Sequence, residues 1–148
     1  MKSLFTLSLL VLVLWPGASL LGQSEAEASQ DLHLGHWMGL DDGEVGFINM
    51  NKKGFAYFVV DGENMGGESF LVEGMEMYMR YQIDYTQSPQ AIDFILYFKK
   101  GDIESGRLPG IFRFEGPDKL FICVSFDGAA RPSTFEAEDT IEFSRVAE

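Results

Sequence analysis

Apolar side chains recur at every second position over much of this chain, and this period restricts the fold more than any other feature. In residues 92–98 the even positions hold Ile, Phe, Leu and Phe, and residues 120–126 and 140–144 repeat the alternation. Successive side chains of a β-strand point to opposite faces, so this period is typical of strands with one buried face. No stretch of about 11 or more residues after Trp15 has the three-and-four repeat of an amphipathic helix. We therefore predict an all-β fold.

Turn residues divide the alternating pattern into short strands joined by hairpin links. The predicted strands lie at residues 36–40, 45–50, 55–60, 69–73, 75–85, 92–98, 107–115, 119–126 and 140–144. About eight to nine strands at a spacing of roughly 8 to 12 residues are typical of an antiparallel sandwich or barrel. We favour an up-and-down, lipocalin-like β-barrel, because an open sheet with so many aromatic strand positions would expose adhesive edges.

Four short motifs follow one another in the second half of the chain. They are Pro89-Gln90-Ala91-Ile92-Asp93, Gly110-Ile111-Phe112, Leu120-Phe121-Ile122-Cys123 and Arg131-Pro132-Ser133-Thr134-Phe135. Their order resembles the C-terminal half of a bacterial family of lipocalin-like domains of unknown function, first described in planctomycetes. The resemblance implies a lipocalin-like barrel. It implies no reaction, because none is known for the family.

A structural latch is predicted from Trp37, Arg131 and Phe135. The segment Leu34-Gly35-His36-Trp37 resembles the entry strand of lipocalins, in which a Trp plugs the closed end of the barrel. Residues 127–138 interrupt the hairpin rhythm, and we expect Phe135 to anchor this loop against the barrel end. A guanidinium is suited to stacking and to forked hydrogen bonds. Arg131 is therefore expected to bond backbone carbonyls or to stack on Trp37; a solvated charge and a ligand contact are the alternatives.

The interior of the predicted barrel is the candidate ligand site. A barrel of about eight strands is either just wide enough for one small ligand or filled by its own side chains. The first hypothesis is a binding protein that holds an apolar or amphipathic small molecule, and the alternative is a packed structural or protein-interaction domain. A new type of enzyme is a third hypothesis. The predicted ligand-binding residues are Phe47, Phe58, Met77, Phe94, Leu96, Phe112 and Ile122.

No catalytic residue, metal site or cofactor is predicted. Cys123 lies in an apolar run, where a thiol is more often a small buried hydrophobe than a nucleophile. His33 and His36 would point to opposite faces of an extended strand, which argues against a shared metal ion.

Two other groups of residues are candidate metal sites. The acidic turns lack the ligand spacing of a calcium loop. Met75, Met77 and Met79 share one strand face, where apolar filling is favoured over a copper site.

The first residues predict export. A Lys at position 2, an apolar run ending at Trp15 and the small residues that follow are typical of a signal peptide over residues 1–22. Such a run is too short to span a membrane. Residues 23–31 are predicted to be a flexible N-terminal lead-in and residues 32–148 the lipocalin-like barrel domain. The expected location is therefore secreted or periplasmic, with no membrane span after cleavage.

The charge of the chain limits its partners. The formal net charge is -12, and the only adjacent basic pairs are Lys52-Lys53 and Lys99-Lys100, each next to a glycine of a turn. Nucleic acid and anionic membranes are bound by clustered Lys and Arg. Nucleic acid is therefore not an expected partner, and the sequence identifies no particular protein partner.

Overall fold

The computed structural model describes residues 31–41, 44–60, 62–136 and 139–147. The chain divides into two units, Met1–Asp31 and Leu32–Glu148, and the second of these is described below. The predicted signal peptide over residues 1–22 and residues 23–30 of the predicted lead-in lie outside the described residues, as do residues 137–138 of the predicted loop.

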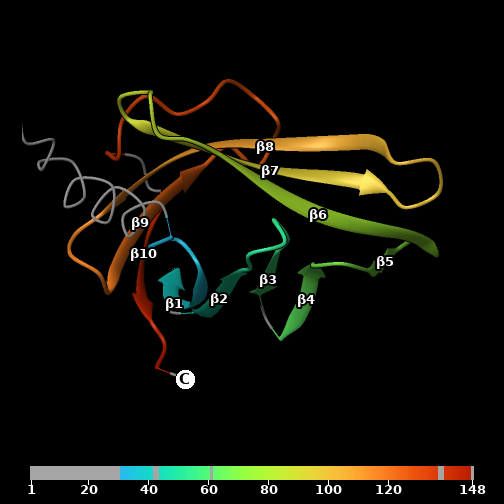
Figure 1. Ribbon diagram of the computed structural model, residues 1–148, viewed down its shortest axis with the longest axis horizontal. Helices are drawn as coiled ribbons and strands as arrows, with labels where there is room; N and C mark the ends of the chain where they lie inside the picture. Colours follow the sequence, from blue (N-terminus) through green and yellow to red (C-terminus); the bar gives the residue numbers. More distant parts are fainter. Residues whose placement is uncertain (1–30, 42–43, 61, 137–138, 148) are drawn as a thin grey trace, which may run out of the picture. The chain divides into compact units, whose positions relative to one another are not determined.

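The described part of Leu32–Glu148 forms one antiparallel sheet of ten strands, drawn in Figure 1. The strands are β1 (Gly35–Asp41), β2 (Glu44–Met50), β3 (Ala56–Val60), β4 (Glu63–Gly66), β5 (Phe70–Val72), β6 (Met75–Asp84), β7 (Gln90–Phe98), β8 (Ile103–Phe114), β9 (Lys119–Val124) and β10 (Thr140–Arg145). Their order in the sheet is β4-β3-β2-β1-β10-β9-β8-β7-β6-β5. All neighbouring strands are therefore consecutive in sequence except β1 and β10, which join the two halves. The predicted all-β, up-and-down antiparallel barrel is confirmed, with slightly more strands than expected.

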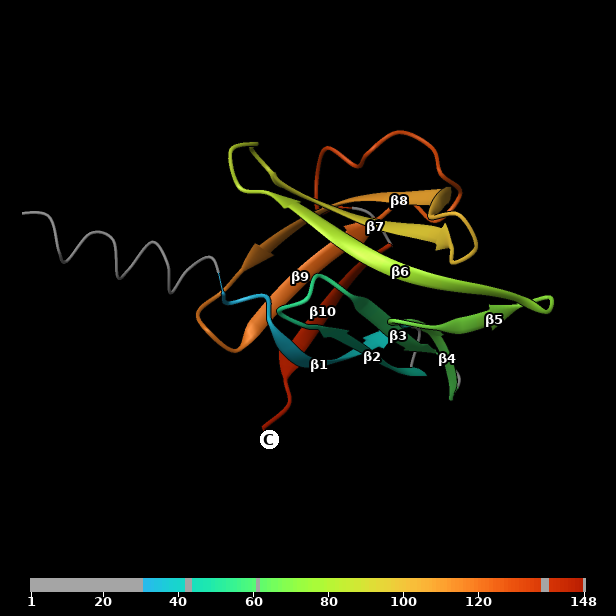
Figure 2. The same cartoon turned by 45° about the vertical axis from the view of Figure 1, so that its right-hand side comes forward.

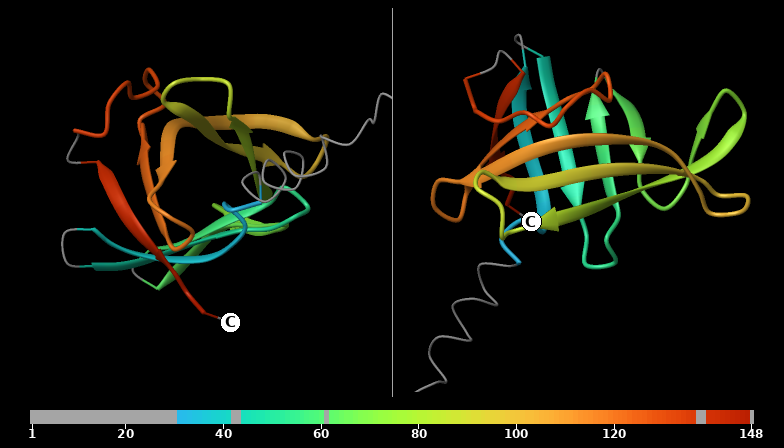
Figure 3. Two further views of the ribbon diagram at one scale, coloured as in Figure 1. Left: turned by 60° about the vertical axis from the view of Figure 1, so that its left-hand side comes forward. Right: turned by 90° about the horizontal axis from the view of Figure 1, so that it is seen from above.

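The sheet curls round until its two halves nearly meet. Figure 2 and Figure 3 show β1 to β4 on one side of the interior and β6 to β8 on the other. A single antiparallel bridge joins Phe55 to Arg80. Beside it, the Gly67 amide donates to the carbonyl of Ala56 (2.7 Å), and the Met79 amide donates to the carbonyl of Gly67 (2.9 Å). These bonds tie β3 to β6, so that the barrel is nearly closed.

One end of the barrel is filled by its own side chains, and we call it the filled end. Trp37 on β1 pairs with Ile48 on β2, and both are almost completely buried. The indole N–H donates to the carbonyl of His33 (3.0 Å). Phe112 and Leu120 reach the same core from β8 and β9. Trp37, the predicted plug, is thus a fully buried member of this core.

The cation on the indole of Trp37 is Arg145 of β10, and not Arg131. The Arg145 guanidinium carbon lies 4.1 Å from the centre of the ring. Its Nη1 and Nη2 donate to the carbonyls of Leu34 (2.8 Å) and Leu32 (2.6 Å). A planar guanidinium can stack and form forked hydrogen bonds at the same time. Arg145 therefore joins the entry segment of the chain to its last strand.

Arg131 holds the connection between β9 and β10 against the outside of the barrel. Its Nη1 donates to Asp93 Oδ1 (2.6 Å) on β7 and to the carbonyl of Gly110 (2.7 Å) on β8. Arg107 donates to the other oxygen of Asp93 (2.9 Å). We call Asp93, Arg107 and Arg131 the loop clamp. The expected bonds from Arg131 to backbone carbonyls are present, but on this outer face.

A second apolar layer lies on the same outer face of the sheet as the loop clamp. Ala91, Ile111 and Cys123 are directly paired on the outer face of β7, β8 and β9, and each is nearly completely buried. Phe135 lies farther along the same connection, with the Arg113 guanidinium carbon 5.3 Å from its ring centre. Phe135 thus lies beside Arg113 of β8, and its packing against the barrel end stays a prediction.

Candidate ligand pocket at the hollow end of the barrel

A pair of facing glycines removes two inner side chains from the other end of the barrel, and we call it the hollow end. Gly39 on β1 is directly opposite Gly46 on β2, two positions along from the pair Trp37 and Ile48. Side chains that are two apart on a strand share a face. The positions that would continue the filled core therefore carry no side chain. A Cβ on Gly46 would have a single neighbour within 4 Å, the carbonyl oxygen of Val59 at 3.6 Å.

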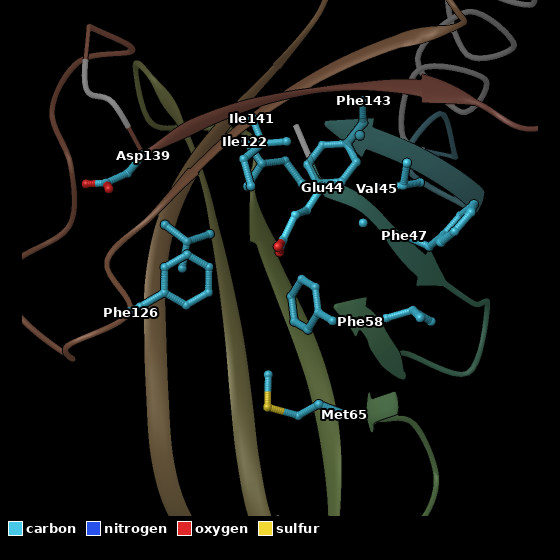
Figure 4. A pocket seen from close by; sticks show the side chains of 14 residues that line it. Glu44, Val45, Phe47, Phe58, Met65, Ile122, Phe126, Asp139, Ile141 and Phe143 are labelled. Atoms are coloured by element: carbon cyan, nitrogen blue, oxygen red, sulfur yellow. The ribbon is translucent and has the colours of Figure 1, made fainter. Parts of the chain in front are cut away.

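The space beside these glycines is a cavity of about 460 Å³. Its wall comes from both halves of the sheet, because β9 and β10 face β3 and β4 across it. Figure 4 shows the side chains that surround it. The lining residues are Gly39, Glu44, Val45, Gly46, Phe47, Phe58, Val59, Met65, Ile122, Val124, Phe126, Asp139, Ile141 and Phe143.

Ile141 and Phe143 of β10 pack against Gly39 and form the aromatic and aliphatic side of the cavity. A Cβ on Gly39 would lie only 2.8 Å from both Ile141 Cγ2 and Phe143 Cδ1. Real Cβ atoms do not approach other atoms this closely. The absence of a side chain on β1 therefore allows Ile141 and Phe143 to lie across that strand, where they form one side of the cavity.

Two carboxylates are the charged groups among the described lining residues. Glu44, on the inner face of β2 two positions before Gly46, points into the space between Phe58 and Phe126 in Figure 4. Asp139 lies at the rim, just before β10, and its carboxylate points away from that space. No Lys, Arg or His occurs among the described residues that line the cavity. The pocket is thus apolar with a negative group inside it.

The predicted ligand-binding residues divide between the cavity and the packed core. Phe58 and Ile122 line the cavity. Phe94 is fully buried and contacts the Phe58 ring edge to face, with 4.8 Å between the ring centres. It therefore supports the wall and is absent from the lining.

The remaining predictions lie elsewhere. Met77 and Leu96 face the interior on β6 and β7 but do not border the cavity. Phe112 belongs to the filled end, where its ring contacts Tyr85 and Phe114.

Phe47 requires a correction. It borders the cavity, but Ile48 and Met50 of the same strand are buried inside, so the alternation places the Phe47 side chain on the outer face. It is 38% exposed, and Figure 4 shows its ring directed away from Glu44.

Several lining residues escaped the sequence reasoning. Gly39 and Gly46 have no side chain to attract attention, and Glu44 resembled part of an acidic turn. Phe126 was an apolar residue at the end of a predicted strand and is 60% exposed at the rim. The two glycines can be recognised in the sequence only when β1 and β2 are aligned, because the space they leave depends on Gly39 facing Gly46.

The other candidate metal sites of the sequence were searched for in the part of the chain that the structure describes. No group of at least three His, Cys, Asp or Glu side chains suited to a metal ion occurs within the described ranges. His33 is buried, with Nε2 and Nδ1 within 2.9 and 3.0 Å of the hydroxyls of Tyr81 and Tyr85. Met77 and Met79 are buried in the barrel, whereas Met75 is 46% exposed.

Comparison with protein-family models, with curated proteins and with solved structures finds no match to this chain. Within the described residues there is no helix long and apolar enough to cross a bilayer. Inferences about function therefore depend on the pocket itself.

Proposed function

We propose that this chain is a small exported, lipocalin-like binding protein that holds an apolar or amphipathic small molecule at the hollow end of its barrel. The observation that carries the proposal is the cavity of about 460 Å³ with Phe, Ile, Val and Met in its wall. Ligand pockets commonly have volumes of about 300–1,000 Å³ and apolar walls with a few polar groups. The pocket has these properties.

The division of the barrel into two ends favours this function over the alternative of a packed interaction domain. The filled end is closely packed, and Trp37, Ile48 and Met50 there are each at most 1% exposed. At the hollow end Ile141 and Phe143 cover Gly39, whereas the space beside Gly46 is open. A rigid, filled base below an apolar cavity is a suitable arrangement for holding a ligand without rebuilding the fold.

Gly46 provides a direct test, because a side chain at this position would enter the cavity. There is room for a Cβ there, so Gly46→Leu is expected to fold and to fill part of the pocket. We expect the wild-type protein to bind the fluorescent apolar probe N-phenyl-1-naphthylamine saturably. We expect Gly46→Leu to weaken that binding at least about tenfold, equivalent to about 1.4 kcal/mol.

The matched control is the same substitution at another strand glycine. Gly106 on β8 has nothing within 4 Å of an added Cβ and does not line the cavity. Gly106→Leu should therefore bind the probe like the wild type. The proposal fails if the folded wild-type protein does not bind the probe, or if both variants bind it equally well.

Export is tested separately from binding. The mass of the mature protein recovered from the periplasm or culture medium should correspond to a chain that lacks the segment 1–22. Recovery of the uncleaved chain from the cytoplasm alone would contradict the export part of the proposal.

A further inference from the structure

A second cavity, of about 640 Å³, lies at the filled end of the barrel. It borders the start of β1, the turn between β2 and β3, and the residues that follow β10. Among the described residues, none lines both this cavity and the apolar pocket of the hollow end. The residues that line it are Leu34, Gly35, His36, Asn49, Met50, Asn51, Lys52, Tyr57, Arg145, Val146 and Ala147.

Basic side chains gather in the wall of this second cavity. Lys52 and Arg145 are the charged residues of its described lining, and His36 is a third basic residue. No Asp or Glu occurs among the described residues that line it. The whole chain has a net charge of -12, so a wall of this sign is a local exception. Lys52 and Arg145 are far apart in sequence and border the same cavity because β1 pairs with both β2 and β10.

The ammonium group of Lys52 has no structural use in the fold. Lys52 is exposed in the turn between β2 and β3, and it forms no ion pair with any residue that the structure describes. The next residue, Lys53, has the same exposed setting but donates to Glu68 Oε1 (3.0 Å). Lys52 is therefore available to an anion from solution, whereas Lys53 already has a carboxylate.

The guanidinium of Arg145 retains free donors after its structural bonds. Its Nε donates to the carbonyl of Pro117 (3.0 Å), and Nη1 and Nη2 each donate to a carbonyl of the entry segment. A guanidinium has five N–H groups, so part of this set has no acceptor within the described ranges. Nη1 lies beside the cavity, because a Cβ on the lining residue Gly35 would be only 3.3 Å from it.

Polar side chains form a row next to these two cations. His36 pairs with Asn49 across β1 and β2, and Asn49 pairs with Tyr57 across β2 and β3. Directly paired residues share a face of the sheet. The amide nitrogen of Asn49 lies 2.8 Å from Nδ1 of His36, and Tyr57 adds a hydroxyl that can donate a hydrogen bond. The cavity thus combines positive charge with neutral hydrogen-bonding groups.

We propose that this cavity binds a small, soluble phosphate monoester, with the phosphate group between Lys52 and Arg145. A phosphate group has a charge of about -1.5 to -2 at neutral pH and three acceptor oxygens, which exceeds what a carboxylate offers to the same donors. The donors come from the turn after β2, from β10 and from the row on β1 to β3. The organic part of the ligand occupies the rest of the cavity, beside Leu34 and Met50.

Three small probes that differ in their charged group test the proposal. They are glycerol 3-phosphate, glycerate and glycerol, each titrated calorimetrically into the wild-type protein at low and constant ionic strength. We expect glycerol 3-phosphate to bind with a Kd below about 1 mM and glycerate at least about fivefold more weakly. Glycerol should give no measurable binding. Failure of glycerol 3-phosphate to bind, or equally tight binding of glycerate, overturns the proposal.

Two adjacent lysines provide a matched pair of variants. Lys52→Gln and Lys53→Gln each remove one positive charge from the same exposed turn, so they change the net charge equally. Only Lys52 lines the cavity. We expect Lys52→Gln to bind glycerol 3-phosphate at least about fivefold more weakly and Lys53→Gln to bind it like the wild type. Equal effects of the two substitutions would show a response to overall charge and overturn the site.

The two histidines of the chain locate the bound phosphate. His36 lines the cavity, whereas His33 is buried with its Nε2 2.9 Å from the hydroxyl of Tyr81. During titration with glycerol 3-phosphate at constant pH, the ring NMR signals of His36 should shift saturably and those of His33 should not. No shift at His36, or equal shifts at both rings, contradicts the assignment to this cavity.

A phosphate group could also belong to a lipid, and vesicles distinguish the two sources. The net charge of -12 disfavours approach to an anionic bilayer. We therefore expect no sedimentation of the protein with vesicles of equal parts phosphatidylcholine and phosphatidic acid. Sedimentation that Lys52→Gln abolishes would overturn the soluble ligand in favour of a lipid head group. Lys52→Gln should bind N-phenyl-1-naphthylamine like the wild type, and weaker binding would contradict the separation of the two cavities.

Discussion

The two ends of this barrel are built from the same strands but differ in what their inner positions carry. At the filled end Trp37 faces Ile48, and two positions farther along the same strands Gly39 faces Gly46. The first pair makes a core with at most 1% exposure, and the second borders a cavity of about 460 Å³. The same two strands therefore border a structural core where their inner positions carry Trp and Ile, and a candidate ligand site where these positions carry Gly. The backbone topology is the same at both ends.

The two ends also differ in charge. Arg145 closes the filled end by stacking on Trp37 and donating to carbonyls of the entry segment. The described lining of the hollow end has Glu44 and no basic residue. The filled end thus uses its cation to join two segments of the chain, whereas the charged residues in the described lining of the hollow end are acidic.

Trp37→Ala should have the largest effect, because it removes the centre of the filled end. The indole is completely buried, donates a hydrogen bond to His33 and stacks with Arg145. Truncation of a buried Trp costs about 3–5 kcal/mol. We expect a loss of this size in the free energy of unfolding, measured by urea denaturation. A loss below about 1 kcal/mol would contradict the assignment of Trp37 as the central packing residue.

The same substitution at one Phe of each end compares the ends directly. Phe112 is 1% exposed in the filled end, and Phe126 is 60% exposed at the rim of the pocket. We expect Phe112→Ala to lower the free energy of unfolding by about 3–4 kcal/mol. Phe126→Ala should change stability by less than about 0.5 kcal/mol and weaken binding of N-phenyl-1-naphthylamine. Equal loss of stability in the two variants would remove the distinction between the ends.

Asp93 connects stability to pH through the loop clamp. Burial alone would raise the pKa of Asp93, but hydrogen bonds and charges from Arg131 and Arg107 hold this pKa below its ordinary value. The unfolded carboxyl has a pKa of about 3.9, so the contribution of the clamp is complete above that pH and is lost as the pH falls through the lower folded value.

Asp93→Asn should therefore destabilise the protein by about 1–3 kcal/mol at neutral pH and reduce the loss of stability on acidification. Glu104→Gln is the control, since the exposed Glu104 pairs with Arg107 but leaves Asp93 and Arg131 in contact. It should leave the stability close to that of the wild type, because exposed ion pairs contribute little. Urea denaturation between pH 3 and 7 measures both, and parallel pH curves for wild type and Asp93→Asn would contradict the role of the clamp.

The smallest effect compares the two glycines of the hollow end. Gly39→Ala would bring a methyl group within 2.8 Å of Ile141 and Phe143, whereas Gly46→Ala meets only the carbonyl of Val59 at 3.6 Å. Overpacking costs about 1–3 kcal/mol, and we expect the lower part of this range for Gly39→Ala. Gly46→Ala should be within about 0.5 kcal/mol of wild type by thermal denaturation. Equal changes in stability for Gly39→Ala and Gly46→Ala would show that the cavity does not lie beside Gly46.

Sequence reasoning predicted the parts of the fold that depend on local periodicity. Alternation along β7 and β9 is visible in the residues themselves, and so are the turns between hairpins. β4 was missed because Glu63 and Asn64 are typical turn residues, and their strand conformation depends on pairing with Val60 and Val59. Tertiary pairing overrides local preference at such positions.

The candidate site was less predictable from the sequence. The presence of a cavity and the sheet face on which a side chain lies both depend on how the strands pair. Phe47 was assigned to the interior for its size, yet a one-residue difference in position moves a side chain to the other face. The role of Arg145 was invisible because its partners, Leu32 and Leu34, lie at the other end of the barrel domain in sequence. The pocket depends on two residues with no side chain, which no hydrophobic pattern records.

Methyl NMR of isoleucine-labelled protein during titration with decanol tests most directly whether the hollow end holds the ligand. Ile122 and Ile141 line the cavity, Ile48 and Ile92 are buried in the core, and Ile103 is 60% exposed at the start of β8. We predict that the methyl signals of Ile122 and Ile141 shift saturably and show contacts to the decanol chain, while those of the other three do not. Saturable contacts at Ile103 alone, or no shift at Ile122 and Ile141, would contradict the account.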